Sequence, residues 1–395
     1  MRVLVISHMY PNVVEPHSGI FVHKQLKELA KLCQVKVVSP VPWSPRALWF
    51  RSKWRRYGQR SGFDVLDGIE VFYPRMLCLP GSLLFEWYGY VLYWAIRETI
   101  EEIEKSFRFD LIHCHVALPD GFGGMLVNRR YRRKLLVTIH GQDVAQTVFR
   151  NNRCKAAVER VLAEADGIIA VSRKVAEKVR AHCRDGSKVR TINDGFSLQD
   201  VVEADTQLRD RYAAGKILLA VGSLVKSKGH DLLLQALASV VRQIGDVRLL
   251  IIGSGREKQD LKRLVARLGL ESHVSFLGSL PHQEVMRYMS ICDMFVLPSW
   301  SEGFGISYLE AMAHGKPVIA CRGEGIEDIV VDGENGILVT PRNVEDVERA
   351  ITTLLVKETY REAMGSKARR MAENYTWGGI AQQIFALYSE VTGAN

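Results

Sequence analysis

Residues 298–339 read PSWSEGFGISYLEAMAHGKPVIACRGEGIEDIVVDGENGILV, and this stretch decides the fold that we expect. An apolar run at 294–297 precedes it and predicts a short buried strand. A glycine-bearing turn follows at 302–305, and residues 306–314 are mostly good helix formers that end at a capping glycine. A second apolar run at 318–321 predicts the next strand. This succession indicates an α/β fold with a parallel sheet.

The turn and the start of the predicted helix have the composition of an anion-binding site. Free backbone N–H groups and the helix dipole favour negative charge there, and Gly303 and Gly305, on either side of Phe304, let a ligand approach the backbone. Glu302 and Glu310 flank the site, eight residues or about two helical turns apart. Such carboxylates suit the vicinal hydroxyls of a sugar or ribose. Alternatively, each is a solvated surface glutamate.

The string from Glu302 to Glu310 resembles the motif of retaining glycosyltransferase family 4, with two glutamates separated by seven residues in E-G-F-G…E-A-M-A…G-x-P-V. The resemblance covers nearly the whole chain. It implies an α/β GT-B fold, in which two Rossmann-like doubly wound parallel-sheet domains face a cleft. It also implies that Glu302 holds the donor sugar and that Glu310 binds ribose.

The length of 395 residues is sufficient for two domains. We expect an acceptor-binding domain over 1–196 and a polar linker over 197–215. A nucleotide-sugar-binding domain would then occupy 216–376. The resemblance implies that the last helix, within 377–395, packs back on the first domain.

The β-α-β pattern at 2–39 opens the first domain. Family members carry a Gly-Gly pair in its loop, and this chain has Ser18-Gly19. The resemblance implies that Gly19 meets the donor diphosphate, and the alternative is an ordinary turn glycine.

Two histidines end predicted strands of this domain. His115 ends 111–115, and His140 follows the next strand in an H-G-x-D motif with Asp143. The carboxyl ends of strands face the ligand crevice of open α/β sheets, although a lone histidine is more often structural. The resemblance implies that His140 contacts the donor sugar and leaving phosphate. We expect His115, Asp143 and Asn193 on the acceptor side.

The second domain opens with a strand, the glycine loop from Gly222 and a helix. Lys228 is placed to meet a phosphate as a point charge. The family signature is Gly-Arg followed by Lys-Gly, but Ser223 stands at the arginine position and leaves Lys226 as the alternative cation. Gly253 ends a later strand, where we expect a tight turn beside the nucleotide.

The net charge and the cysteine content limit the cellular compartment and the partners that we expect. The net charge of +9 favours an acidic partner: phosphates, nucleic acid or an anionic membrane surface. Seven scattered cysteines indicate free thiols in a reducing compartment, and none has metal-ligand spacing. No signal peptide or membrane span is visible. We therefore expect a cytoplasmic protein, and the family resemblance implies that it needs no cofactor or metal.

Residues 43–60, WSPRALWFRSKWRRYGQR, interleave aromatic rings with basic side chains. This composition suits an anionic membrane surface or a lipid-linked acceptor, at the cytoplasmic membrane face. Single-stranded nucleic acid or a packed helix with a solvated basic face are the alternatives. No RNA-binding motif is present, so we expect no nucleic acid partner. Residues 82–96 form a second aromatic-rich segment that could line an apolar groove.

Together these patterns predict a glycosyltransferase with His140, Lys228 and Glu302 as its catalytic residues. It would move a sugar, with retained anomeric configuration, from a nucleotide-sugar donor to a glycan or lipid-linked glycan of the cell envelope. Donor frequency in the family favours UDP. A sugar-nucleotide epimerase or phosphorylase of similar fold, and a non-catalytic nucleotide-sugar-binding module, remain alternatives.

Overall fold

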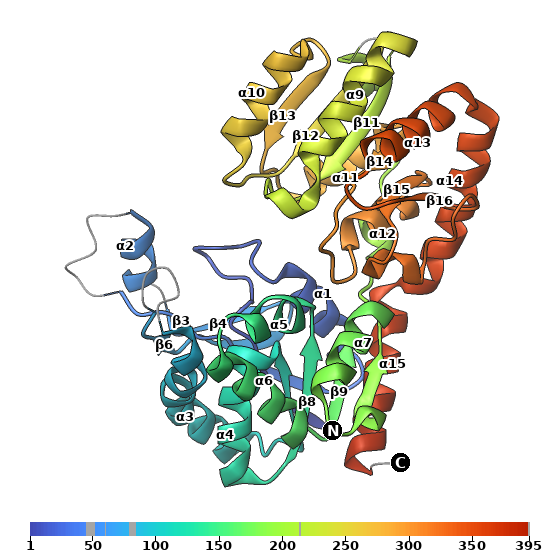
Figure 1. The fold of residues 1–395 in the computed structure, drawn as a ribbon. Coiled ribbons are helices and arrows are strands. Elements are labelled where there is room, and N and C mark those ends of the chain that lie inside the picture. Colours follow the sequence, from blue (N-terminus) through green and yellow to red (C-terminus); the bar gives the residue numbers. More distant parts are fainter. Residues whose placement is uncertain (45–51, 60, 79–83, 213–214, 394–395) are drawn as a thin grey trace. The chain divides into compact units, whose positions relative to one another are not determined.

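The computed structural model describes residues 1–44, 52–59, 61–78, 84–212 and 215–393 (Figure 1). The chain forms two compact units. Met1–Asp194 and Trp377–Asn395 make the first, and Gly195–Thr376 makes the second. Each unit is a parallel sheet with helices packed on it, as the α/β prediction required.

The first unit contains an eight-stranded sheet in the order β10-β9-β8-β7-β1-β2-β5-β4. Its strands are β1 (Arg2–Ile6), β2 (Gln34–Val38), β4 (Phe63–Leu66), β5 (Ile69–Phe72), β7 (Leu111–His115), β8 (Lys134–Ile139), β9 (Gly167–Ala170) and β10 (Val189–Thr191). Only β4 is antiparallel to its neighbour. The direction of chain progression reverses between β1 and β7, and such a switch point is where open α/β sheets bind ligands. The short strands β3 (Val41–Pro42) and β6 (Arg75–Met76) pair separately.

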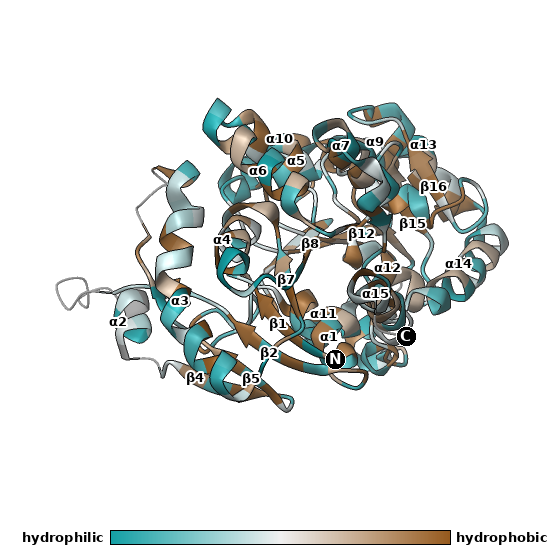
Figure 2. Cartoon of the chain, turned by 90° about the horizontal axis from the view of Figure 1, so that it is seen from below, coloured by the Kyte–Doolittle hydropathy of each residue, from teal (hydrophilic) through white to brown (hydrophobic). Residues whose placement is uncertain are grey.

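The first unit also contains helices, several of which pack on this sheet. They are α1 (Ile20–Leu29), α2 (Ser52–Gln59), α3 (Tyr88–Ser106), α4 (Phe122–Tyr131), α5 (Gln142–Ala145), α6 (Asn152–Glu164), α7 (Arg173–His182) and α15 (Trp377–Thr392). The apolar strands β1, β2 and β7 appear brown between them in Figure 2. α15 packs against α1, and the hydroxyl of Tyr388 lies 2.6 Å from Nδ1 of buried His113. The last helix therefore completes the core of the first unit.

The second unit contains a six-stranded, all-parallel sheet in the order β13-β12-β11-β14-β15-β16. Its strands are β11 (Lys216–Val221), β12 (Val247–Ile252), β13 (Val274–Gly278), β14 (Met294–Val296), β15 (Val318–Cys321) and β16 (Gly336–Val339). Its longer helices are α9 (His230–Ile244), α10 (Lys258–Leu268), α11 (His282–Ile291), α12 (Ile306–Ala313), α13 (Val344–Val356) and α14 (Glu358–Ala372). β14, α12 and β15 confirm the strand, helix and strand predicted around the 302–305 turn. The switch point of this sheet lies between β11 and β14.

The segment predicted as a linker, 197–215, differs from that expectation over its described residues. It contains the short helix α8 (Thr206–Asp210), and the described part belongs to the second unit, whose boundary falls after residue 194 rather than 196. Asp205 binds Arg287 of α11, with 2.6 Å between Oδ2 and a guanidinium nitrogen. Polar residues that suggested a linker, such as Asp205, instead form ion pairs. A sequence pattern does not distinguish polar residues in ion pairs from those of an exposed linker.

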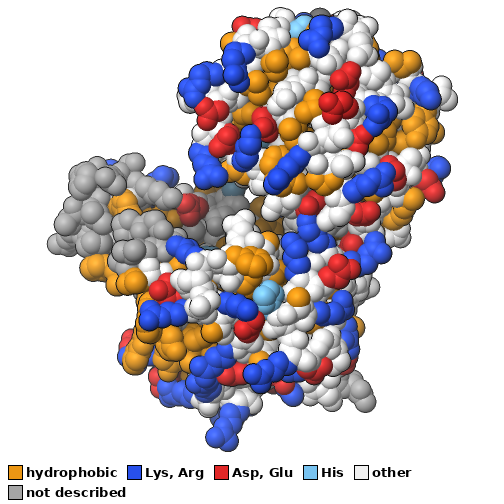
Figure 3. All heavy atoms as spheres, in the orientation of Figure 1, with side chains coloured by type: hydrophobic (Ala, Val, Ile, Leu, Met, Phe, Trp, Pro, Cys, Tyr) orange, Lys and Arg blue, Asp and Glu red, His pale blue; other side chains and the backbone are white. Residues whose placement is uncertain are grey.

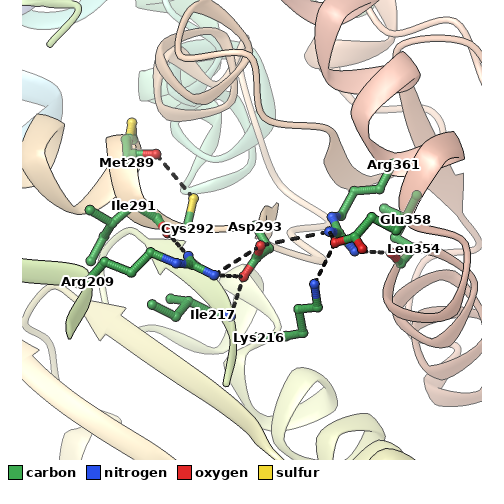
Figure 4. A network of polar contacts seen from close by, with 10 residues as sticks. All are labelled: Arg209, Lys216, Ile217, Met289, Ile291, Cys292, Asp293, Leu354, Glu358 and Arg361. Atoms are coloured by element: carbon green, nitrogen blue, oxygen red, sulfur yellow. Dashed lines mark hydrogen bonds and ion pairs between the residues drawn. The ribbon is translucent and has the colours of Figure 1, made fainter. Parts of the chain in front are cut away.

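A polar network holds this segment to the second unit (Figure 4). Asp293 accepts hydrogen bonds from the backbone N–H of Ile217, at 2.7 Å, and from Arg209, at 3.1 Å. Arg361, 5% exposed, lies 4.0 Å from Asp293 and also pairs with Glu358. α8, β11 and α14 are therefore joined through one carboxylate and its cations.

Candidate active site

Lys228 and Glu302 form an ion pair at the carboxyl edge of the second unit's sheet. Lys228 belongs to the loop after β11, and Glu302 to the turn after β14, so the pair lies at the switch point. Their side chains are only 19% and 15% exposed. The backbone N–H of Glu302 donates to Glu324, at 2.8 Å, which further fixes the turn. The structure thus brings together two of the three predicted catalytic residues.

The glycine turn sits at the N-terminus of α12, as predicted. Gly305 is the N-cap and has φ +99, a left-handed conformation that strongly favours glycine. The carbonyl of Gly303 is packed so closely that a Cβ on Gly325 would lie 1.9 Å from its oxygen. Phe304, predicted on the donor side, is 2% exposed, so its ring is not available to a ligand. The turn therefore presents no aromatic ring.

Glu310 of α12 lies beside a histidine that the sequence did not single out. Nε2 of His282 is 3.6 Å from Oε1 of Glu310 and 3.2 Å from Oδ2 of Asp200. All three side chains are between 13% and 26% exposed. Glu310 is therefore accessible to a ribose but already lies next to a cation when His282 is protonated.

The loops after β11 and β12 contain both packed and exposed positions. Gly253 has φ +148, and a Cβ there would lie 1.9 Å from the carbonyl oxygen of Gly222, so the chain's own packing requires glycine. At Gly222 the nearest atom to an added Cβ is 3.5 Å away. Ser223 is exposed. Lys226, the alternative cation, pairs with Asp231.

The switch point of the first unit holds a pair that sequence reasoning missed. His8 follows β1, and Asp120 follows β7. Nδ1 of His8 lies 2.9 Å from both carboxylate oxygens of Asp120, which is fully buried. Burial alone would lower the pKa of His8, but the attraction of Asp120 outweighs it and raises that pKa. The available signal was that both residues follow strands next to the switch point.

His115 and His140 contact each other directly. Nδ1 of His115 lies 3.1 Å from Nε2 of His140, and the two rings stack at 5.3 Å. The ring of Phe21 meets His140 edge-on at 5.0 Å. Burial lowers the pKa of His140 to about 4 and that of His115 well below its ordinary value. Both imidazoles are therefore neutral near pH 7.

The remaining predicted residues of the first unit contact backbone groups of other residues in that unit. Oδ1 of Asp143 accepts from the N–H of Ala117 at 2.7 Å, and burial raises the pKa of Asp143 to about 6. Asn193 donates to the carbonyl of Val171 at 3.0 Å. Gly19 is the left-handed N-cap of α1, and a Cβ on it would meet the carbonyl oxygen of Met9 at 2.1 Å. These contacts give Gly19 and Asn193 structural roles irrespective of any ligand.

The aromatic and basic stretch 43–60 is described only in part, because 45–51 and 60 lie outside the described residues. Within it Trp43 is 47% exposed and Tyr57 only 5%. Across the described ranges, no helix is long and apolar enough to cross a membrane. In the same part of the chain, no group of three or more His, Cys, Asp or Glu side chains is arranged to hold a metal ion.

Family models match both units. The model described as Glycosyltransferase Family 4 matches residues 18–200, and Glycosyl transferases group 1 matches 205–371. An uncharacterized glycosyltransferase of Methanocaldococcus jannaschii is 30% identical over 74% of this chain and 78% of its own. A GDP-mannose-dependent α-(1-6)-phosphatidylinositol monomannoside mannosyltransferase of Mycolicibacterium smegmatis is 29% identical over 84% and 85%.

Solved structures match the whole chain in fold. Sucrose-phosphate synthase from Thermosynechococcus elongatus superposes with a TM-score of 0.84, at 23% identity over 100% of both chains. An Anabaena protein in complex with UDP and glucose gives a TM-score of 0.74, at 21% identity over 99% of this chain and 100% of that one. The fold is GT-B, and the homologues are transferases of hexosyl groups. The chain is therefore a glycosyltransferase that belongs to family 4.

Proposed function

We propose that this enzyme moves a hexosyl group from a UDP-sugar to a glycan or lipid-linked glycan of the cell envelope, with retention of anomeric configuration. The observation that carries the proposal is the Lys228–Glu302 pair beside the N-terminus of α12. A largely buried lysine next to a helix N-terminus suits a diphosphate. An adjacent carboxylate suits sugar hydroxyls.

The reaction needs the departing diphosphate stabilised, because negative charge develops there in the transition state. In the proposed mechanism, the donor draws Lys228 from Glu302 to the diphosphate. Glu302 then accepts hydrogen bonds from the sugar hydroxyls and stabilises positive charge at the anomeric carbon. The N–H groups at Gly303–Gly305 add to the anion site. Lys228 supplies charge that a metal ion would otherwise provide, so the proposal includes no metal or cofactor.

Glu310 would bind the ribose hydroxyls, and His140 would orient the donor sugar. Asp143, His115 and Asn193 would lie on the acceptor side. No nucleophile is assigned, because the proposal follows a front-face reaction in which the acceptor oxygen attacks the face that the diphosphate leaves.

The relatives leave two choices for the nucleotide of the donor, UDP and GDP. One solved neighbour binds UDP, and one relative uses GDP-mannose. A thermal-shift screen with UDP, GDP, ADP and their sugar derivatives decides this, because a ligand of the native state raises its melting temperature. A larger shift with UDP than with GDP is expected, and the reverse result would replace UDP in the proposal.

The acceptor proposal draws on the mannosyltransferase relative, which acts on a phosphatidylinositol monomannoside. It also draws on the aromatic and basic composition of 43–60, which would bring the protein to the cytoplasmic membrane face. Nucleic acid is not a proposed partner. Replacing Arg55 and Arg56, both exposed, with Ser should weaken binding to phosphatidylglycerol vesicles, and unaltered binding would remove the membrane part.

Nucleotide release tests the class of function. A transferase releases nucleotide rapidly only with an acceptor, and an α-linked product from an α-linked donor demonstrates retention by NMR of the anomeric proton. A non-catalytic module releases none. An epimerase returns the nucleotide-sugar with an altered sugar.

A further inference from the structure

A small cavity of about 230 Å³ opens between α3, α4 and α6 of the first unit. Its lining includes Trp87, Tyr90, Phe122, Arg153, Ala156 and Arg160. Ligand pockets for whole small molecules are typically about 300–1,000 Å³, so this cavity suits a segment of a ligand. We call it the α3–α6 slot.

Aromatic rings form the wall of the slot and continue outward along α3. The ring of Tyr90 packs on Phe122 at 5.0 Å and on Trp87 at 5.7 Å. Trp87, Tyr90 and Trp94 are 47%, 39% and 59% exposed, and their spacing places them on one side of the helix. Hydrophobic side chains gather over α3 in Figure 3. Soluble surfaces seldom group such rings without a partner.

The charges on the rim favour an anion. The guanidinium of Arg153, 71% exposed, lies 5.7 Å from the centre of the Trp87 ring. Arg160 is the second cation of the lining and pairs with Glu164, 3.0 Å away, while Glu86 lies 3.9 Å from Arg153. Arg153 is therefore the more loosely held of the two cations, and it lies beside the aromatic rings. Exposed tryptophan and tyrosine beside arginine suit the boundary between hydrocarbon and an anionic head group.

The slot lies next to the segment that follows β7. Phe122 lies two residues after Asp120, the carboxylate that holds His8 at the switch point. The short helix over Ala117–Gly121 that carries Asp120 packs against both α3 and α6. Asp120 itself is fully buried, so the slot rather than this carboxylate is open to a ligand.

We propose that the α3–α6 slot binds the hydrocarbon segment of an amphiphilic, anionic acceptor lipid, with Arg153 beside its head group. This inference rests on the proposed glycosyl transfer and names the chemical class of its acceptor. The hydrocarbon lies against Tyr90 and Phe122, where each methylene group removed from water adds to the affinity.

The test is calorimetric titration of the full chain with dodecyl phosphate below its micelle concentration. Saturable binding is expected. Ala156→Phe fills the slot from an exposed position, so the fold is retained, and it should weaken binding at least ~10-fold, because the tail loses its apolar contacts. Ala163→Phe, also exposed and on the same helix, is the matched control and should bind normally. Inorganic phosphate alone should not bind there.

Equal affinity in Ala156→Phe, or a native protein that shows no saturation, would overturn the proposal. UDP binding is measured in parallel. Nucleotide binding without dodecyl phosphate binding refutes the slot and leaves the proposed donor chemistry standing. Dodecyl phosphate binding without nucleotide binding refutes the donor chemistry instead.

An independent observation concerns the histidine pair. His115 is fully buried, and its Nε2 has no hydrogen-bond partner, whereas its Nδ1 faces Nε2 of His140. An orphaned buried N–H is costlier and rarer than an unused acceptor. The proton of neutral His115 therefore belongs on Nδ1, where it donates to His140. Nε2 of His140 then accepts, and its own proton is on Nδ1.

We infer that His115 is a positioning residue that holds His140 as the Nδ1–H tautomer. No contact recorded for the described residues occupies Nδ1 of His140, so this N–H is available to a donor sugar or phosphate oxygen. The inference rests on the proposed role of His140 and assigns its hydrogen-bonding direction.

NMR of the full chain with ¹⁵N-labelled histidine tests this without activity. His140 should show a protonated Nδ1, and a protonated Nε2 would overturn the inference. His115→Phe removes the hydrogen bond that fixes the proton of His140, so His140 should become a mixture of tautomers. This loss should lower kcat about 10-fold. The affinity for UDP should stay unchanged. His115→Asn, which retains an N–H donor, should restore part of both. Tyr388→Phe, which removes a hydroxyl from His113 but no hydrogen bond of His115 or His140, should leave the His140 signal unchanged.

Discussion

Lys228 and Glu302, contributed by neighbouring loops of one sheet, neutralise each other in a pocket that leaves less than a fifth of either side chain exposed. Neither side chain can be removed without leaving its partner's charge poorly solvated. The pair is therefore both a structural contact and the proposed point of donor binding.

Lys228→Ala should weaken UDP affinity roughly 10- to 100-fold, since a charge-assisted hydrogen bond contributes about 1.5–3 kcal/mol. It should lower kcat further if the contact strengthens in the transition state. Lys226→Ala is the control, because that lysine is 64% exposed and pairs with Asp231. Equal effects of the two changes on titration calorimetry with UDP would exclude a specific role for Lys228.

Glu310→Gln should weaken UDP binding and leave binding of inorganic diphosphate unchanged, because the proposed contact is to ribose. The loss should be about 10-fold. Glu334→Gln, 63% exposed on the same unit, is the matched control. Unaltered UDP affinity in Glu310→Gln contradicts the ribose assignment.

Gly253→Ala should lower the free energy of unfolding by more than ~1 kcal/mol, because its Cβ would meet the Gly222 carbonyl and its backbone is left-handed. Gly222→Ala has room for the methyl group and should retain near-native stability. Thermal unfolding of both variants checks this. Destabilisation of the same size in both would mean that the loop's packing differs from that described here.

Asp143 gives a pH-dependent prediction. Its folded pKa of about 6 exceeds the unfolded value near ~3.9, so the native state binds more protons between these values. Stability should therefore fall as pH rises from about 4 to 6, by up to about 3 kcal/mol. Asp143→Asn cannot ionise, still accepts from Ala117, and should be more stable than the native protein at pH 8 but not at pH 4. Asp246→Asn, 59% exposed, should show no such difference.

Asp293→Ala should destabilise the second unit by about 3 kcal/mol, because it leaves Arg209 and the N–H of Ile217 without their carboxylate. Asp260→Ala removes a 60% exposed carboxylate and should cost less than about 1 kcal/mol. Calorimetric unfolding compares the two, and equal melting temperatures would show that the network adds nothing.

The sequence predicts the parts of the fold whose signal is local. The runs at 294–297 and 318–321 and the glycines around Phe304 determine β14, β15 and the start of α12 without reference to the rest of the chain. The β4–β5 hairpin was missed, although Asp67-Gly68 between alternating residues is a hairpin signal. Burial alternates along both strands, but Leu66 and Phe72 interrupt the apolar–polar alternation of the sequence, so that signal is weak.

The site was predictable only where a motif specifies it. Lys228, Glu302 and His140 belong to motifs, but the His8–Asp120 and Glu310–His282 contacts join residues far apart in sequence. Such pairs depend on which strands are neighbours in the sheet. The sequence around the end of one strand does not reveal which strand lies next to it. Phe304 shows the converse, because its motif position gave no information on the burial of its ring.

The return of α15 to the first unit has a consequence for biosynthesis. α1 precedes the second unit in the chain, whereas its covering helix α15 follows that unit. The first unit can thus be completed only after the second unit has been synthesised. A nascent chain stalled before Trp377 would expose α1 and leave His113 without the hydroxyl of Tyr388, a form that protein quality control can recognise.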